Sequence, residues 1–164
     1  MMNGPLTPEQ WLKEKLHIDL TKDNEREMSC FLLLWILFER KVLKTNGRHV
    51  SKAIIDKAPT IQVDFQPILG IIRDWYITGK KEGLIFTRFS FDSRILKQSV
   101  ESYLDNSDTT DENVQRFVIA IIYQYRCNLF HGEKDLSSVA NTQADRFKAF
   151  NIFLTACLNT VRDL

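Results

Sequence analysis

The sequence predicts an all-α protein, a bundle of four main helices with shorter helices between them. Apolar residues recur at steps of three and four in the longer segments, which is the spacing of one helix face. Start and stop signals bound these segments, such as Thr7-Pro8-Glu9-Gln10 before the first and Asn46-Gly47 after the second. A strand pattern is visible only in a short stretch, 84–89.

The expected helices follow from these signals. In chain order they cover about 8–16, 24–43, 51–58, 65–78, a segment capped by Asp92 or Ser93 and ending at Leu104, a segment capped by Asp111 and ending near Gly132, and 142–163. The residues expected to face inward are Trp11, Leu12, Phe31, Leu34, Trp35, Phe38, Ile68, Ile71, Ile72, Trp75, Tyr76, Ile95, Leu96, Val100, Leu104, Phe147, Phe150, Ile152, Phe153, Leu154, Leu158 and Val161.

The helix expected at 24–43 is apolar on two sides. Its second side carries Leu32, Leu33, Ile36 and Leu37. A helix of this kind is either central in the bundle or part of an oligomer interface. Glu39 ends the apolar run, and we expect it to be exposed unless it lies beside Arg126.

Length and composition favour one soluble domain, residues 1–164. The chain has 164 residues, 44% of them hydrophobic and 26% charged, and a formal net charge of +1. A nucleic-acid site must therefore be a local basic patch. The three cysteines, Cys30, Cys127 and Cys157, fall in apolar helical segments and are expected to be reduced core residues. With neither a targeting segment nor a membrane span, a cytoplasmic location without membrane contact is expected.

The stretch 115–134 is the most informative part of the sequence. Its first half is almost wholly apolar, and then Arg126, Asn128 and His131 appear within six residues before Gly132 ends the pattern. These polar residues are either a solvated last turn or a functional site.

The segment Arg126-Cys127-Asn128-Leu129-Phe130-His131-Gly132, with Lys134 shortly after, resembles the R-x4-H signature of HEPN domains. The resemblance implies a four- to five-helix up-and-down bundle whose signature helix is next to last. It also implies a metal-independent endoribonuclease without a cofactor, acting as a toxin or defence effector in a cleft between two protomers of a homodimer. An antitoxin such as a nucleotidyltransferase is a further expected partner.

The spacing of the motif bears on its geometry. At about 100° per residue, Asn128 and His131 lie about 60° apart and share a helix face, whereas Arg126 and His131 lie about 140° apart. Either the helix ends early and His131 swings round, or a two-fold axis lets two chains complete each other's site. Tyr125 and Phe130, with the second apolar face of helix 24–43, are candidates for that interface.

The residue types suit RNA cleavage. Arginine offers a charged, planar fork of donors to a phosphate, and histidine, which titrates near neutral pH, can take the 2'-hydroxyl proton or protonate the leaving 5'-oxygen. Asn128 would orient His131 or bind a phosphate oxygen. Attack by the 2'-oxygen predicts a cyclic phosphate product and no cleavage of DNA. The sequence contains no HExxH, no GxxxxGK[ST], no GxSxG and no metal-like carboxylate spacing.

Basic residues elsewhere are candidates for binding the RNA. Lys134 follows the motif, and Lys80, Lys81 and Arg88 alternate with phenylalanines in the segment after the fourth helix. This alternation suits single-stranded nucleic acid, although buried phenylalanines flanked by solvated lysines would give the same pattern.

Two positions depart from the HEPN pattern. Cys127 replaces the polar residue that commonly follows the arginine, and Glu133 stands where one toxin branch has a modified tyrosine. The alternative function is a non-catalytic HEPN bundle that dimerises and binds a nucleotide or a partner protein. A chance motif in an unrelated helical protein is the third interpretation.

Overall fold

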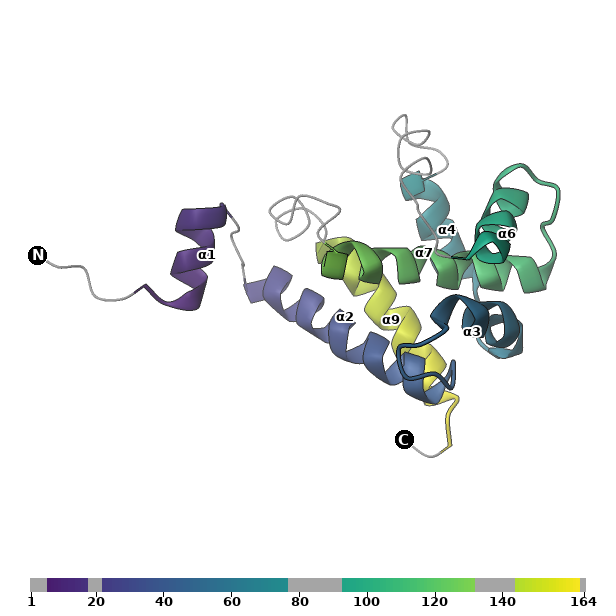
Figure 1. Cartoon of the computed structure of the whole chain (residues 1–164), viewed down its shortest axis with the longest axis horizontal. Helices are drawn as coiled ribbons and strands as arrows, with labels where there is room; N and C mark the ends of the chain where they lie inside the picture. Colours follow the sequence, from purple (N-terminus) through teal and green to yellow (C-terminus); the bar gives the residue numbers. More distant parts are fainter. Residues whose placement is uncertain (1–5, 18–21, 77–92, 132–143, 163–164) are drawn as a thin grey trace, which may run out of the picture.

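The computed structural model describes residues 6–17, 22–76, 93–131 and 144–162. Within these ranges the chain is helical and has no strand (Figure 1). The elements are α1 (Pro8–Leu16), α2 (Lys22–Lys41), α3 (Val50–Lys57), the 3-10 turn η1 (Ala58–Thr60), α4 (Gln66–Tyr76), α6 (Arg94–Leu104), α7 (Asp111–His131) and α9 (Ala144–Asn159). The predicted all-α class is therefore confirmed. The strand pattern at 84–89 lies outside the described residues.

Local capping accounts for several helix starts. Thr7 and Gln10 form the expected capping box at α1, with Pro8 as the first helical residue. The Ser93 hydroxyl accepts from the Leu96 amide at the start of α6, with an O–N distance of 3.3 Å. At α7 the prediction was one residue late: Thr110 caps the helix, because its hydroxyl accepts from the Asn113 amide at 3.4 Å.

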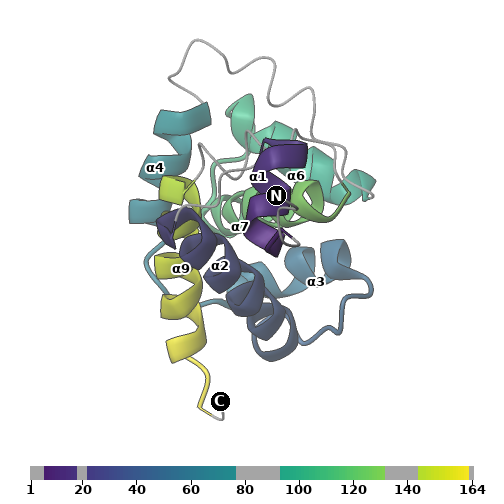
Figure 2. The ribbon, with the colours of Figure 1, turned by 90° about the vertical axis from the view of Figure 1, so that its left-hand side faces the viewer.

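Helix α7 is the centre of the fold. Every residue from Phe117 to Tyr125 is buried, which covers more than two turns on all sides of the helix. α7 contacts α3, η1, α4 and α6, and Figure 2 shows the other helices arranged around it. A helix that is apolar all round must be enclosed in this way.

Helices α2 and α9 pack extensively against each other (Figure 1). The Phe31 ring lies 5.2 Å from the Phe147 ring and 5.9 Å from the Phe150 ring, measured between centroids. Asn151 of α9 donates from its amide nitrogen to the backbone and carboxylate oxygens of Glu27, both at 2.9 Å. This polar link fixes how the two helices are aligned.

Some residues that were expected to face inward are exposed. Ile71, Ile95 and Ile152 are 37%, 64% and 67% exposed, whereas the next residue of each helix is buried. Neighbouring helical residues point about 100° apart, so the buried face admits only one of each pair. Trp11 is 48% exposed, because α1 lies apart from the other helices at one end of the molecule (Figure 1).

The second apolar side of α2 is only partly covered by the described part of the chain: Leu32 packs against the core, but the other three residues are exposed. Leu33, Ile36 and Leu37 are 65%, 43% and 41% exposed and lie at helical spacing. We call these three residues the α2 patch. Cys30, one turn before Leu33, is also exposed, so its assignment to the core was wrong, whereas Cys157 is buried as expected. Within the described residues, no helix is long and apolar enough to span a membrane.

Candidate functional site

Arg126 of α7 lies beside Glu39 of α2. The Arg126 Nε is 3.8 Å from the Glu39 Oε1, and the side chains are 25% and 8% exposed. From the sequence, Glu39 was expected to be exposed unless it lay beside Arg126. It does lie beside Arg126, and it is buried. A buried carboxylate requires a cation and hydrogen bonds to offset its lost hydration. Glu39 therefore supplies a charge partner for the guanidinium, at a distance longer than a hydrogen bond, while part of Arg126 stays accessible.

One aromatic side chain bonds to the carboxylate, and a second packs against the first. The Trp35 indole N–H donates to the Glu39 Oε1 from one turn earlier in α2. The Trp35 ring stacks on the Tyr123 ring of α7, with centroids 5.9 Å apart, and Trp35 is almost fully buried. Because Tyr123 is one turn before Arg126, the same contact between α2 and α7 positions both members of the ion pair.

The loop after α2 closes over the other side of Glu39. The Thr45 amide donates to the Glu39 backbone carbonyl at 2.9 Å. Gly47 has a φ of +85°, and a Cβ at this position would lie 3.8 Å from the Glu39 Oε2. A positive φ favours glycine. Gly47 therefore allows the tight turn that places the loop next to the Glu39 carboxylate.

Helix α7 continues without a break to His131. The proposal that the helix ends early and lets His131 swing toward Arg126 was therefore wrong at the level of the backbone. The separation of about 140° around the helix stands. Asn128 and His131 lie in the last turns of α7, but their side chains are outside the described part of the structure. Cys127 packs against the core, as a small apolar residue would.

Tyr125 cannot line a dimer interface, because it is buried within its own chain. Its hydroxyl accepts from the Arg146 Nη1 at 2.6 Å. The Arg146 guanidinium also lies over the Trp75 ring, 5.5 Å from its centroid. Burial raises the pKa of Tyr125 to about 12, although Arg146 acts in the opposite direction. The phenol is therefore neutral at physiological pH and links α7 to α9.

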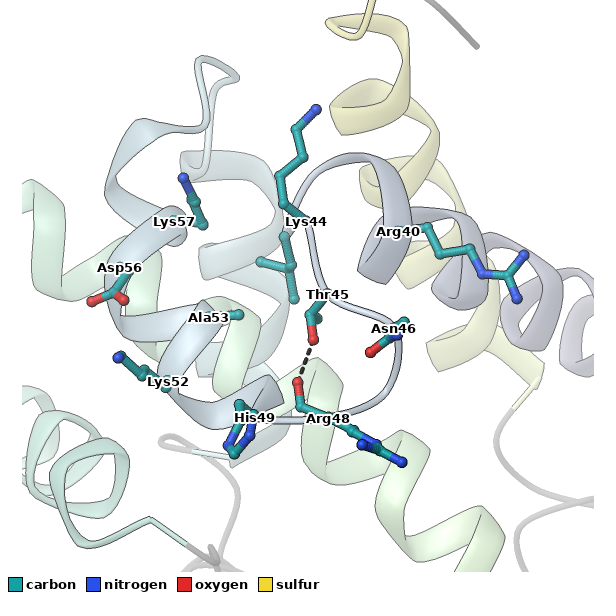
Figure 3. A pocket seen from close by; sticks show the side chains of 11 residues that line it. Arg40, Lys44, Thr45, Asn46, Arg48, His49, Lys52, Ala53, Asp56 and Lys57 are labelled. Carbon is teal, nitrogen blue, oxygen red and sulfur yellow. Dashed lines mark hydrogen bonds between the residues drawn. The ribbon is translucent and has the colours of Figure 1, made fainter.

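The four lysines and arginines that were expected to bind substrate, Lys80, Lys81, Arg88 and Lys134, lie outside the described residues. The structure instead places a different basic group in a hollow beside the loop that follows α2 (Figure 3). Sequence analysis missed it. The signal was present: residues 40–57 contain six Lys or Arg and one Asp, whereas the other 146 residues contain sixteen basic and twenty acidic residues.

Among the described residues, no group of three or more His, Cys, Asp or Glu side chains is placed to hold a metal ion. In comparisons with protein-family models, curated proteins and solved structures, no match to the chain was found. The resemblance to HEPN domains thus depends on the motif and on the helical pattern of the chain.

Proposed function

We propose that the chain is a HEPN-type endoribonuclease, a four- to five-helix HEPN-like bundle that acts on RNA as a toxin or defence effector. The observation that carries the proposal is the setting of Arg126. A buried carboxylate from another helix pairs with its Nε edge at 3.8 Å, while a quarter of the side chain remains accessible. A catalytic arginine needs this combination, because transition-state stabilisation depends on donors that are positioned before the reaction.

A second copy of the chain would complete the site. The positions of Arg126 and His131 are about 140° apart around a continuous helix, so one helix does not bring both residues to one phosphate. An isologous dimer presents every residue twice around its axis, and the α2 patch, which is exposed among the described residues, supplies an apolar surface for such a contact. Glu39, in the same helix, faces inward to Arg126, so α2 links the proposed interface to the proposed site.

The proposed reaction uses the 2'-hydroxyl of the RNA as the nucleophile. One His131 imidazole takes the hydroxyl proton, the 2'-oxygen forms a bond to phosphorus, and the bond to the 5'-oxygen breaks. A second, protonated His131 gives its proton to the leaving 5'-oxygen. Arg126 stabilises the charge that gathers on the phosphate oxygens. The products are a 2',3'-cyclic phosphate and a 5'-hydroxyl.

Incubating the purified protein with RNA in excess chelator tests this function. We expect cleavage with a cyclic phosphate end, and no cleavage of the same strand made as DNA. Arg126→Ala and His131→Ala should each lower the cleavage rate at least 100-fold, the order of magnitude of a lost general acid–base or charge-stabilising group. Arg26→Ala and His17→Ala are matched controls, because both residues are exposed and lie elsewhere. Cleavage that survives both site variants rules out the assignment.

The dimer is tested separately by the mass of the protein in solution. Leu33→Asp places a charge in the α2 patch and should give a monomer, with cleavage lost in parallel. Ile95→Asp is the matched control, because Ile95 is equally exposed on α6. A wild-type monomer that cleaves RNA would contradict the shared site.

Two observations favour a second candidate, a non-catalytic HEPN bundle that dimerises and binds a nucleotide or a partner protein. The ion pair with Glu39 gives Arg126 a structural role that needs no substrate, and Cys127 lacks the polar group common at that position in the family. This candidate predicts that Arg126→Ala lowers stability but that neither the wild type nor any variant cleaves RNA.

A further inference from the structure

A basic hollow lies between the C-terminal end of α2, the loop 42–49 and α3. Its volume is about 1070 Å³. The side chains of Arg40, Lys44, Arg48, Lys52 and Lys57 line it, and Asp56 is the only acidic residue among the described residues of the lining. Figure 3 shows Lys52, Asp56 and Lys57 of α3 on one side of the loop and Arg40 of α2 on the other.

The five cations of the hollow are not neutralised within the described part of the chain. All five are exposed, and none of them belongs to an ion pair between described residues. With Asp56 included, the lining carries a formal charge of +4. Like charges gathered in one concave surface raise the local potential and attract polyanions.

The loop 42–49, which carries Lys44 and Arg48, has a defined shape. Lys44, Gly47 and His49 have positive φ values of 58°, 85° and 55°. The Thr45 hydroxyl donates to the Arg48 carbonyl, and the Thr45 amide donates to the Glu39 carbonyl. These bonds tie the loop to itself and to α2. A preformed site loses less conformational entropy on binding than a flexible one.

The chemistry of the hollow fits a repeating anion. Five separate cations spread over about 1070 Å³ suit several phosphates of one strand rather than a single phosphate group. Apart from the His49 imidazole, no described aromatic side chain on which a base could stack lines the hollow. Contacts to the backbone fix the position of a strand without reading its sequence.

We propose that this hollow binds the phosphodiester backbone of RNA and leads the strand toward Arg126. The proposal depends on the proposed function for the identity of the polyanion. The connection is short: Thr45 and Gly47 lie against Glu39, and Glu39 holds Arg126. The loop that borders the hollow is thus in direct contact with the residue that pairs with Arg126.

The test measures binding of a labelled 20-nucleotide RNA and of the same sequence as DNA by fluorescence anisotropy. The double variant Arg48→Glu/Lys52→Glu should weaken binding of both strands at least tenfold at about 0.1 M salt, and should lower the slope of log affinity against log salt by about 1.4. The control, Lys97→Glu/Lys148→Glu, makes the same change in net charge at two exposed residues of α6 and α9. It should change affinity less than threefold.

The neutral variant Arg48→Gln/Lys52→Gln, with a melting curve for each protein, separates lost contacts from misfolding. Equal losses in the test and control variants would overturn the proposal. Competition by polyglutamate as strong as that by RNA of equal charge would also overturn it, in favour of an acidic protein partner. The DNA strand has no 2'-hydroxyl and cannot be cleaved by the proposed reaction, so it reports on binding alone. If binding depends on the hollow but no RNA is cleaved, the proposed nuclease function is rejected and the binding site is retained. If Arg48→Glu/Lys52→Glu binds and cleaves as the wild type does, only the proposed binding site is rejected.

Discussion

Replacing Glu39 with glutamine removes the charge next to Arg126 and keeps the shape of the side chain. The amide oxygen can still accept from the Trp35 indole, so the change isolates the ion pair. At 3.8 Å the attraction between the charges is about 4 kcal/mol for an effective dielectric constant of about 20. Desolvation of Glu39 offsets most of it, and the partly exposed Arg126 regains water when the pair is lost. We expect a net loss of about 1–2 kcal/mol in the free energy of unfolding.

Glu39→Ala should cost more than Glu39→Gln. It also leaves the buried Trp35 N–H without its acceptor, which adds about 1–3 kcal/mol. In a chain of this length, each kcal/mol lowers the melting temperature by about 2–4 °C. The glutamine variant should therefore melt about 5 °C lower and the alanine variant about 10 °C lower than the wild type.

Urea denaturation of a double-mutant cycle measures the pair directly. Glu39→Gln and Arg126→Met should show a coupling energy of about 1 kcal/mol or more. The pair of Glu112 and Arg116 is the matched control, because it has a similar distance, 3.9 Å, but Glu112 is 70% exposed. Its coupling should stay below about 0.5 kcal/mol. Equal coupling in the two cycles would refute the reasoning that burial makes the Glu39 pair important.

Three further predictions concern the core. Burial raises the pKa of Tyr125 from 10.0 to about 12, so between these pH values only the unfolded chain releases the phenol proton and the folded state should lose stability. Urea titrations at pH 9 and 11 should show a smaller loss of stability in Tyr125→Phe than in the wild type. Asn113→Ala should lower the free energy of unfolding by about 2–3 kcal/mol, because the buried Asn113 amide donates to the Asp108 carbonyl at 2.8 Å and to the Ser99 carbonyl of α6. Urea denaturation measures the loss, and Asn159→Ala, at an exposed position, is the control. The Cys157 thiol, whose pKa burial raises to about 12, should react with a thiol reagent only after unfolding, and labelling of the native protein at Cys157 would contradict its burial.

Helix positions were largely predictable because their signals are local. The capping box at Thr7 and Gln10 and the cap at Ser93 depend on contacts between residues three apart. The apolar spacing of α2 likewise predicted that Phe31, Trp35 and Phe38 are buried. None of these inferences required knowledge of the partner helix.

The choice between adjacent apolar residues was not predictable. Ile95 and Leu96 are equally apolar, yet only Leu96 is buried, because α6 meets α7 along one narrow face. Ile152 and Phe153 of α9 show the same pattern. The orientation of a helix is set by tertiary packing, which a short periodic pattern specifies only to within about one residue.

The candidate site divides in the same way. The motif identified Arg126, and sequence reasoning stated the condition under which Glu39 would be buried, but a contact between residues 87 apart is a property of the fold. The basic hollow was hidden for another reason. Its charge is visible between residues 40 and 57, but acidic residues elsewhere in the chain bring the total to +1. The net charge of the whole chain therefore did not reveal this local basic group.

The cost of burying charge bears on why α2 and α7 carry this ion pair. Well-packed apolar residues often stabilise a core as much as a buried ion pair does, or more. Stability alone therefore does not favour a glutamate at position 39 and an arginine at position 126. The arrangement makes sense if the charge of Arg126 is itself required, because Glu39 then serves to hold a partly accessible guanidinium in one orientation. The backbone carbonyl of the same residue accepts from the Thr45 amide in the loop beside the basic hollow, so a single buried residue joins the proposed phosphate-binding arginine to the proposed path of the strand.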